Sequence, residues 1–210
     1  MNYECYQGIY FRPNTNDLNI IKEKDYNCVF EYINKDTVVL DVGAHIGSFT
    51  IRCLAHDPKK VMCVEPSPEN VNVLRLNLNK APNVGVLRCA VSGQERLLVD
   101  TKCKFKTNPG YKLTTIDHIS DDGNLEVAVV SLSYLLTKYK PNVVKIDIEK
   151  EELRLNFRNL PECVKVIAVE IHPKKNQRAI VNQLFAQRFI LRYLTNSKLE
   201  ENAVFIFVRD

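Results

Sequence analysis

The chain is 210 residues long with a mass of 24.2 kDa, which fits one domain with a substantial core. Apolar residues make up 45% of it and charged residues 26%, and no apolar run approaches the roughly 18 residues of a transmembrane helix. The net charge of +4 and the pI near 8.6 are mildly basic, short of the pI above about 9 typical of nucleic-acid-binding domains. From these values we expect no transmembrane helix, and they do not favour a strongly basic nucleic-acid binder.

The seven cysteines are scattered and form no Cys-x-x-Cys pair, which favours reduced, buried thiols over a disulfide or zinc framework. The first residues, MNYECYQGIYFRP, contain no basic segment followed by an apolar core, so we expect no signal peptide. We therefore predict a cytoplasmic protein with no membrane partner. The sequence does not indicate an oligomeric state.

Strand and helix patterns alternate along most of the chain, which predicts a single α/β domain with a largely parallel sheet. The expected parallel strands cover residues 38–42, 61–64, 84–89, 127–130, 143–148 and 164–172. The expected helices cover residues 47–55, a segment opened by Ser67-Pro68-Glu69, and residues 132–139 and 174–188. In the last helix we expect Ile180, Val181, Leu184 and Phe185 to face the core.

Three segments depart from this alternation. Residues 1–36 form a lead-in before the first strand, and residues 94–126 read as short strands and turns, an insertion or hairpin near the site. The segments FILRYLT and AVFIFVRD read as a closing antiparallel pair of strands.

The stretch VVLDVGAHIGSFT predicts a strand, a tight turn and a helix that opens on a ligand. Its Asp-x-Gly-x-x-x-Gly spacing differs from the Gly-x-Gly-x-x-Gly of nicotinamide enzymes, and the chain has no phosphate-binding P-loop. This favours a nucleoside that carries an amino acid, as S-adenosylmethionine does. Asp41 would suit its amino group, and backbone N–H groups from Ala44 through His45 to Gly47, just beyond Gly43, would suit its carboxylate. The alternative is a turn that binds nothing.

Glu65 ends the next strand, 24 residues after Asp41. An acid at this place typically accepts hydrogen bonds from the two ribose hydroxyls of an adenosine cofactor. Glu65, with Pro66 beside it, is therefore the predicted ribose ligand, and it makes a turn without a ligand a weaker interpretation.

Acidic residues follow the later strands. The period of two places Lys145, Asp147 and Glu149 on one strand face, where burial of three charges would be costly and a polar cleft is favoured over a core position. Glu170 and His172 share a face at the end of the 164–172 strand. A run of surface charge and a structural histidine are the alternatives.

His172 is the first candidate for the general base, with Glu170 holding its tautomer, and Asp147 is the second. Alternatively, Asp147, Glu149 and Glu170 gather a divalent cation that lowers the pKa of an acceptor hydroxyl. The sequence does not separate these two mechanisms.

The order VVLDVGAHIGSFT, VEPSPENVNVLRLNL, VVKIDIEKEEL and VEIH resembles the FkbM family of S-adenosylmethionine-dependent methyltransferases, and FRPNTNDLNIIKE resembles its lead-in. The resemblance implies a seven-stranded, Rossmann-like class I fold with an antiparallel last strand. It also implies methyl transfer to a hydroxyl of a sugar or small metabolite. The positions that carry over are Asp41, Gly43 and Gly47 in the cofactor loop, Glu65 at the ribose, and Asp147 and Glu149 beside the methyl group.

Two positions depart from the family pattern: Lys150 stands where a glycine is usual, and Ser133 where an aspartate is usual. Because Cys89 and Ala90 end the third strand without an acid, adenine recognition there would use backbone groups.

Three rival functions remain. An RNA methyltransferase would use the basic segment with Lys102, Lys104, Lys106 and Lys112, although the solvated face of a hairpin is the simpler interpretation. A catalytically degenerate binding module would fit the two departures. A nicotinamide-dependent oxidoreductase is disfavoured by the glycine spacing.

Overall fold

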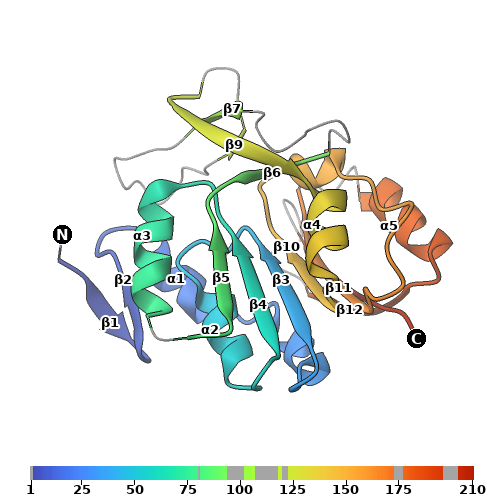
Figure 1. The fold of residues 1–210 in the computed structure, drawn as a ribbon, viewed down its shortest axis with the longest axis horizontal. Coiled ribbons are helices and arrows are strands. Elements are labelled where there is room, and N and C mark those ends of the chain that lie inside the picture. The colour runs from blue at the N-terminus through green and yellow to red at the C-terminus, as the bar shows by residue number, and fades with distance from the viewer. Residues whose placement is uncertain are drawn as a thin grey trace.

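The computed structural model describes residues 2–79, 81–93, 102–106, 118–119, 123–172, 177–195 and 203–210. Its centre is a seven-stranded sheet in the order β12-β13-β11-β10-β3-β4-β5 (Figure 1). The strands, in chain order, are β3 (Val38–Val42), β4 (Lys60–Val64), β5 (Val84–Leu87), β10 (Val143–Ile146), β11 (Val166–Ile171), β12 (Ile190–Thr195) and β13 (Ala203–Val208). The expected strands at the centre of the sheet are all present.

Pairing in this sheet is parallel from β5 to β11, whereas β13 runs antiparallel to both β11 and β12. The closing antiparallel pair and the antiparallel last strand are thus confirmed. Since β3 and β10 are neighbours at the centre, their carboxyl ends lie side by side. This is the edge at which open α/β sheets bind ligands.

Helices cover both faces of the sheet, and an apolar cluster fills each side. On one side, α4 (Leu132–Tyr139) and α5 (Gln177–Ala186) pack against residues such as Leu40 and Ile146. On the other side, α2 (Ser48–Leu54) and α3 (Pro68–Asn77) pack against residues such as Val39 and Val143. β-Branched strands that are buried on both faces explain the continuous apolar runs in the sequence.

The N-terminal lead-in forms a hairpin of β1 (Glu4–Tyr6) and β2 (Ile9–Phe11), then α1 (Asp17–Lys22) and the 3₁₀ helix η1 (Asn27–Tyr32). Figure 1 shows the hairpin beside α3. Hydrogen bonds in both directions between Tyr10 and the Asn77 side chain hold it there. The lead-in is therefore packed onto the first half of the sheet.

A second, small sheet joins β6 (Ala90–Ser92), β9 (Leu125–Ser131), β7 (Lys102–Lys106) and β8 (His118–Ile119) in that order. It lies beyond the end of β5 in Figure 1. Antiparallel pairing of β7 with β8 agrees with a hairpin within 94–126, although much of that segment, Lys112 included, lies outside the described residues. The expected 127–130 strand is part of this sheet.

Two expectations were wrong in detail. The fourth strand ends at Ile146 rather than at 148, because Glu149 and Lys150 adopt left-handed backbone angles, φ 52° and 79°, that turn the chain into the 3₁₀ helix η2 (Glu151–Arg154). Phe185 is 49% exposed, since α5 turns Ile180 and Leu184 inward and leaves Phe185 at the rim, where its ring edge meets Phe207.

None of the helices among the described residues is long and apolar enough to cross a membrane.

Candidate functional site

The loop between β3 and α2 contains the first predicted glycines, and both have left-handed backbone angles, φ 79° at Gly43 and 90° at Gly47. A Cβ on Gly43 would lie 1.8 Å from the carbonyl oxygen of Asp147, and one on Gly47 would lie 2.6 Å from Leu74 Cδ1. Glycine at 43 is thus required by contact with the end of β10.

Asp41 is fully buried beneath this loop. Its Oδ2 accepts a 2.7 Å hydrogen bond from the Thr50 hydroxyl, and its Oδ1 lies 3.4 Å from Lys145 Nζ. Lys145 is also buried; it donates to Gly43 O at 2.7 Å and lies 3.5 Å from Asp147 Oδ2. Although burial opposes its charge, the Asp41 and Asp147 carboxylates raise the pKa of Lys145 above its ordinary value. One ammonium group therefore joins the glycine loop to β10.

Glu65 lies at the end of β4, as predicted, and is 4% exposed. Its Oε2 accepts from the backbone N–H of His45 at 2.9 Å, and its Oε1 accepts from Ser67 N–H at 3.0 Å and from the Asn70 amide at 3.1 Å. The carboxylate thus links the first loop to the start of α3. An ionised carboxylate is an acceptor only, so all three of these hydrogen bonds run to Glu65 from donors in the first loop and at the start of α3.

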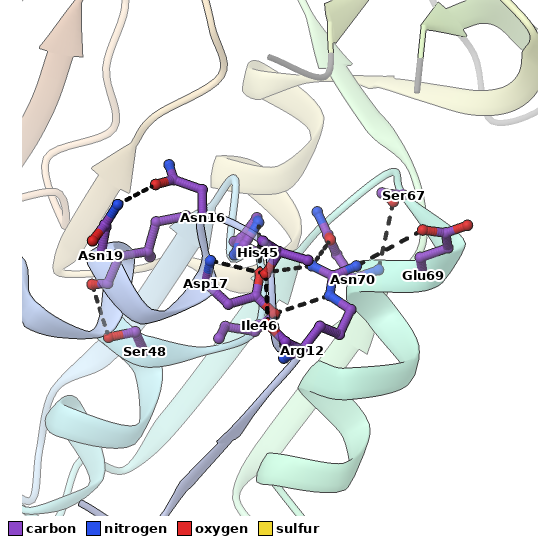
Figure 2. Close-up of polar contacts among 12 residues, drawn as sticks. Arg12, Asn16, Asp17, Asn19, His45, Ile46, Ser48, Ser67, Glu69 and Asn70 are labelled. Carbon is purple, nitrogen blue, oxygen red and sulfur yellow. Dashed lines mark hydrogen bonds and ion pairs between the residues drawn. The ribbon is translucent and has the colours of Figure 1, made fainter. Parts of the chain in front are cut away.

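The lead-in contacts the β3–α2 loop and the start of α3 (Figure 2). Arg12 binds Asp17 through its backbone N–H at 2.9 Å and through its guanidinium at 2.8 and 2.9 Å, and it also donates to Asn70 Oδ1 at 2.7 Å. Asp17 Oδ1 lies 3.8 Å from His45 Nε2. Burial raises and the Arg12 hydrogen bonds lower the pKa of Asp17, with a net result below its usual range. A buried ion pair within the lead-in therefore lies beside the turn, with Asp17 next to the His45 ring and Arg12 bound to Asn70.

His45 itself has φ 50° and a half-buried imidazole. Burial lowers its pKa to about 4; the Arg12 charge acts in the same direction, and Asp17 opposes both. The ring is therefore neutral near pH 7. Its Nδ1 is buried and has no hydrogen-bond partner among the described residues.

A second group of polar residues lies where β10 and β11 end. We call it the acidic cluster: Asp147, Glu149, Glu152, Glu170 and His172. The imidazole is its centre, because Nε2 lies 3.3 Å from Glu170 Oε1 and 3.6 Å from Glu149 Oε2, and Nδ1 lies 3.2 Å from Glu152 Oε1. Oxygen atoms of Asp147 and Glu170 and one ring nitrogen of His172 lie within 4.8 Å of one another. The structure thus brings the four predicted catalytic residues together.

Mutual charge perturbs this cluster. Burial, followed by the nearby Asp147, raises the pKa of Glu149 to about 7 and also raises the pKa of Glu170. Burial opposes the charge of His172, but the hydrogen bonds that its ring donates to Glu152 and Glu170, together with the charge of Glu149, raise its pKa to about 11. In the ligand-free protein His172 is therefore an imidazolium at neutral pH, and it is the counter-ion of the carboxylates.

The lead-in also reaches the acidic cluster. The Tyr26 hydroxyl donates to Glu170 Oε2 at 3.4 Å, and Lys145 Nζ lies 5.4 Å from the centre of the Tyr26 ring. Glu23, at the end of α1, has a pKa raised to about 8 by burial and then by Asp147 and Glu170. One N-terminal segment thus borders both the glycine loop and the cluster.

The remaining predicted residues and the two departures have mainly structural settings. Cys89 and Ala90 are buried where β5 leaves the main sheet for β6, and Pro66 is half-buried beside Glu65. Ser133 Oγ lies 3.0 Å from the Oγ of Ser131, the N-cap of α4, so position 133 is in the first helical turn, where an aspartate would interact favourably with the helix dipole. Lys150 is exposed at φ 79°, a conformation that glycine adopts freely.

Sequence reasoning missed four contributors: Glu152, Tyr26, Asp17 and the cross-linking role of Lys145. Glu152 could have been predicted, because it is an acidic residue in the turn that follows the predicted Asp147. Tyr26 lies more than 100 residues before the acidic cluster in the sequence, and Asp17 lies in the separate N-terminal lead-in. Only the fold therefore brings them to the site.

Residues 41–204 match the methyltransferase FkbM domain. The hexuronic acid methyltransferase AglP of Haloferax volcanii is 26% identical over 182 residues, which cover 84% of this chain and 72% of that relative. M. capricolum TrmK, solved with S-adenosylhomocysteine, is 12% identical with a TM-score of 0.51 over 88% of this chain and 67% of that one. The B. subtilis tRNA methyltransferase TrmK is 12% identical with a TM-score of 0.52 over 89% and 66%.

The structural likeness and the strand order agree on one architecture. The sheet order, the antiparallel β13 and the solved neighbours show the class I methyltransferase fold. The family match covers most of the chain and includes the glycine loop, Glu65 and the acidic cluster. The chain therefore belongs to the FkbM family of methyltransferases.

Proposed function

We propose that this protein transfers a methyl group from S-adenosylmethionine to a hydroxyl oxygen of a sugar. The observation that carries the proposal is the pairing of two structures at one sheet edge: a glycine loop braced by Glu65, and an acidic cluster directly beside it. The contact between Gly43 and the Asp147 carbonyl makes them neighbours. The likeness to a hexuronic acid methyltransferase supports a sugar acceptor.

In this proposal the cofactor lies over the β3–α2 loop. Backbone N–H groups near Ala44 and His45 face its carboxylate, and Glu65 accepts a hydrogen bond from its ribose. Asp41 is buried and already bound by Thr50 and Lys145, so we assign it to holding the loop in place. Membership of a methyltransferase family supports this cofactor.

The reaction needs in-line geometry and removal of one proton. A lone pair of the acceptor oxygen forms the new bond to the methyl carbon, while the C–S bonding pair returns to sulfur and leaves S-adenosylhomocysteine. The hydroxyl proton leaves toward the acidic cluster. Asp147 is the acid next to the loop, and His172, protonated in the free protein, orients and neutralises its carboxylate neighbours.

Negative charge beside the cofactor also favours the positively charged sulfonium over the neutral product. Four carboxylates gather within the cluster, against His172 and the ammonium of Lys145. The surplus negative charge strengthens binding of a cationic cofactor in a partly buried site. We therefore expect S-adenosylmethionine to bind more tightly than S-adenosylhomocysteine.

RNA is the second acceptor class. A basic segment that includes Lys104, exposed on β7, gives some support to it. The likeness to tRNA methyltransferases is at 12% identity and bears on the fold alone. We therefore place sugar hydroxyls first.

The test measures cofactor binding and product mass separately. Glu65→Ala should weaken S-adenosylhomocysteine binding by about 1.5–3 kcal/mol in calorimetry, because the ribose hydroxyls lose a charged acceptor. Glu69→Ala, at a partly exposed position in the first turn of α3, is the control and should bind S-adenosylhomocysteine as the wild type does. Incubation with S-adenosylmethionine and hexuronic acid glycosides should then add 14 Da to the sugar.

Two results would contradict the proposal. Equal affinity of the Glu65 and Glu69 variants would remove Glu65 from the cofactor site. A mass gain on RNA, with none on any sugar, would give the acceptor to the second class.

A further inference from the structure

The acidic cluster has more carboxyl groups than cationic groups. Glu170, Glu149 and Glu152 all lie within 3.6 Å of one imidazole, and Asp147 shares Lys145 with Asp41. Most of these side chains are buried, and Glu152 is not exposed at all. Buried carboxylates in proteins are paired with cations or coordinate metal ions, because an unpaired charge in a dry site is costly.

Two carboxylate oxygens in the cluster lack a hydrogen bond. Glu152 Oε2 and Glu149 Oε2 are both buried and have no hydrogen-bond partner among the described residues. Both carboxylates face the imidazole, since Glu152 Oε1 lies 3.2 Å from Nδ1 and Glu149 Oε2 lies 3.6 Å from Nε2. The cluster therefore has acceptor capacity that the protein itself leaves unused.

The imidazole is oriented as metal-binding histidines are. Glu152 Oε1 accepts from the backbone N–H of His172 at 2.6 Å and lies beside its Nδ1, so the ring is fixed from behind. Its Nε2 then points to the side where Glu170 lies. A carboxylate on the ring nitrogen that does not bind the metal is usual around metal-bound histidines, and Glu152 holds that place here, while Nε2 lies against the carboxylates of Glu170 and Glu149.

From this geometry we infer that Asp147, Glu170 and His172 bind one divalent cation. Their ligand atoms lie within 4.8 Å of one another. Ligands of one ion with bonds of about 2.1 Å lie roughly 3 Å apart in cis and 4.2 Å apart in trans, so small side-chain rotations complete the site. Two carboxylates and one imidazole suit Mn²⁺ or Mg²⁺, and the remaining positions are left for water or an acceptor oxygen.

This inference rests on the proposed function for its chemical purpose. The cation would bind the sugar hydroxyl and lower its pKa, so that Asp147 and Glu170 act by holding the ion. His172 would be a neutral ligand in the metal-bound protein, and the ion would replace its proton as the counter-charge. The position next to the Gly43 loop places the ion beside the methyl group.

Mn²⁺ is the probe for the first experiment. The full chain, stripped with EDTA, is titrated with Mn²⁺ and followed by electron paramagnetic resonance. We expect one bound Mn²⁺ per chain that Mg²⁺ displaces, and ¹⁴N modulation in the pulsed spectrum from a directly bound imidazole. Absence of stoichiometric binding, or bound Mn²⁺ with no ¹⁴N signal, would overturn the assignment without the use of any variant.

Variants locate the ion. His172→Gln and Glu170→Gln should weaken Mn²⁺ binding at least tenfold, and Glu152→Gln about 10- to 100-fold, because it orients the ring. Glu162→Gln, an exposed carboxylate, is the control and should bind Mn²⁺ as the wild type does. Thermal unfolding of each variant checks the fold. Wild-type affinity in the folded His172 and Glu170 variants would contradict the site.

Calorimetry with S-adenosylhomocysteine separates this inference from the proposed function. Cofactor binding without Mn²⁺ binding would reject the cation site and keep the transferase. Mn²⁺ binding without cofactor binding would support the cation site and reject the transferase.

Discussion

At the scale of single residues, backbone conformation explains several positions whose side chains attracted attention in the sequence. Gly43 and Gly47 have left-handed angles and no room for a Cβ. Lys150 has a left-handed angle as well, but a side chain that reaches solvent. The first two are thus required by sterics, and the third carries a conformational strain that glycine would relieve.

The contact of Gly43 with Asp147 predicts a large loss of stability on substitution. Gly43→Ala should lower the free energy of unfolding by about 3 kcal/mol or more, because the new methyl group would overlap a backbone carbonyl. Gly8→Ala is the matched control: its φ is 81°, yet nothing lies within 4 Å of the added carbon, so only about 1 kcal/mol is expected. Urea denaturation compares them, and equal losses would disprove the clash.

The left-handed angle at Lys150 predicts a stabilising substitution. Lys150→Gly should unfold at higher urea concentration than Lys150→Ala, by about 1 kcal/mol, since both remove the charge but only glycine adopts φ 79° without strain. If the alanine variant is the more stable one, conformational strain is not the reason that this position favours glycine.

The lowered pKa of His45 predicts a pH effect on folding. The unfolded imidazole titrates near 6.5 and the folded one near 4, so the unfolded chain binds more protons between these values. Stability from this residue is present above pH 6.5 and is lost as the pH falls toward 4. Asparagine tolerates the φ of 50° at this position and does not titrate. The free energy of unfolding of His45→Asn, relative to the wild type, should therefore rise by about 1–2 kcal/mol when the pH is lowered from 7.5 to 5.

Urea denaturation of both proteins at the two pH values measures this difference. A constant difference would mean that the imidazole titrates normally in the folded protein.

At the scale of elements, the lead-in contacts both halves of the candidate site. It contributes Arg12 and Asp17 to the glycine loop and Tyr26 to the acidic cluster. The pair of Arg12 and Asp17 is buried, with side-chain exposures of 10% and 1%. Removal of one partner leaves the other charge uncompensated.

This burial predicts that Asp17→Asn costs about 3–5 kcal/mol of stability and weakens S-adenosylhomocysteine binding, because the loop at His45 loses its brace. Glu69→Gln is the control: Glu69 Oε2 lies 3.9 Å from Arg12 Nη1 and is 40% exposed, so about 0.5 kcal/mol or less is expected. Thermal and calorimetric measurements test both. A stable Asp17 variant with unchanged affinity would detach the lead-in from cofactor binding.

Elements were predictable from the sequence where their signals are local. Ser67 caps α3 by accepting from the Asn70 backbone, and the following Pro68 and Glu69 mark the first turn, so this helix start is readable. The end of β10 could not be predicted in this way, because neither Glu149 nor Lys150 is a residue type that favours left-handed backbone angles. In the site, the positions of Glu65 and His172 follow from strand ends. Their partners depend on chain segments brought together by folding.

At the scale of the whole molecule, the sheet ends in a strand whose outer side pairs with no other strand of the described residues. β12 is last in the sheet order, and Ile190, Tyr193 and Leu194 on it are 51%, 37% and 50% exposed. Exposed apolar edge strands are sites of unwanted pairing between chains. The opposite end, at β5, continues into the small sheet through β6.

This edge predicts self-association at high concentration. Leu194→Lys should lower light scattering in concentrated solution. It should change the free energy of unfolding by no more than about 0.5 kcal/mol, as is usual for a surface substitution. Arg192→Lys, a charge-preserving change on the same strand, is the control. Scattering that is the same in both variants would exclude the edge as the source.

The packing of the Asp147 carbonyl against the bare Cα of Gly43 has one more consequence. In the proposed arrangement, a single backbone segment separates the cofactor side of the site from the acceptor side, and Lys145 contacts both sides of it. A shift of the turn when the nucleoside enters must displace the main chain that carries the carboxylate on the other side. Sugar affinity should thus rise once the nucleoside is in place, and the two ligands should bind in a preferred sequence, nucleoside first.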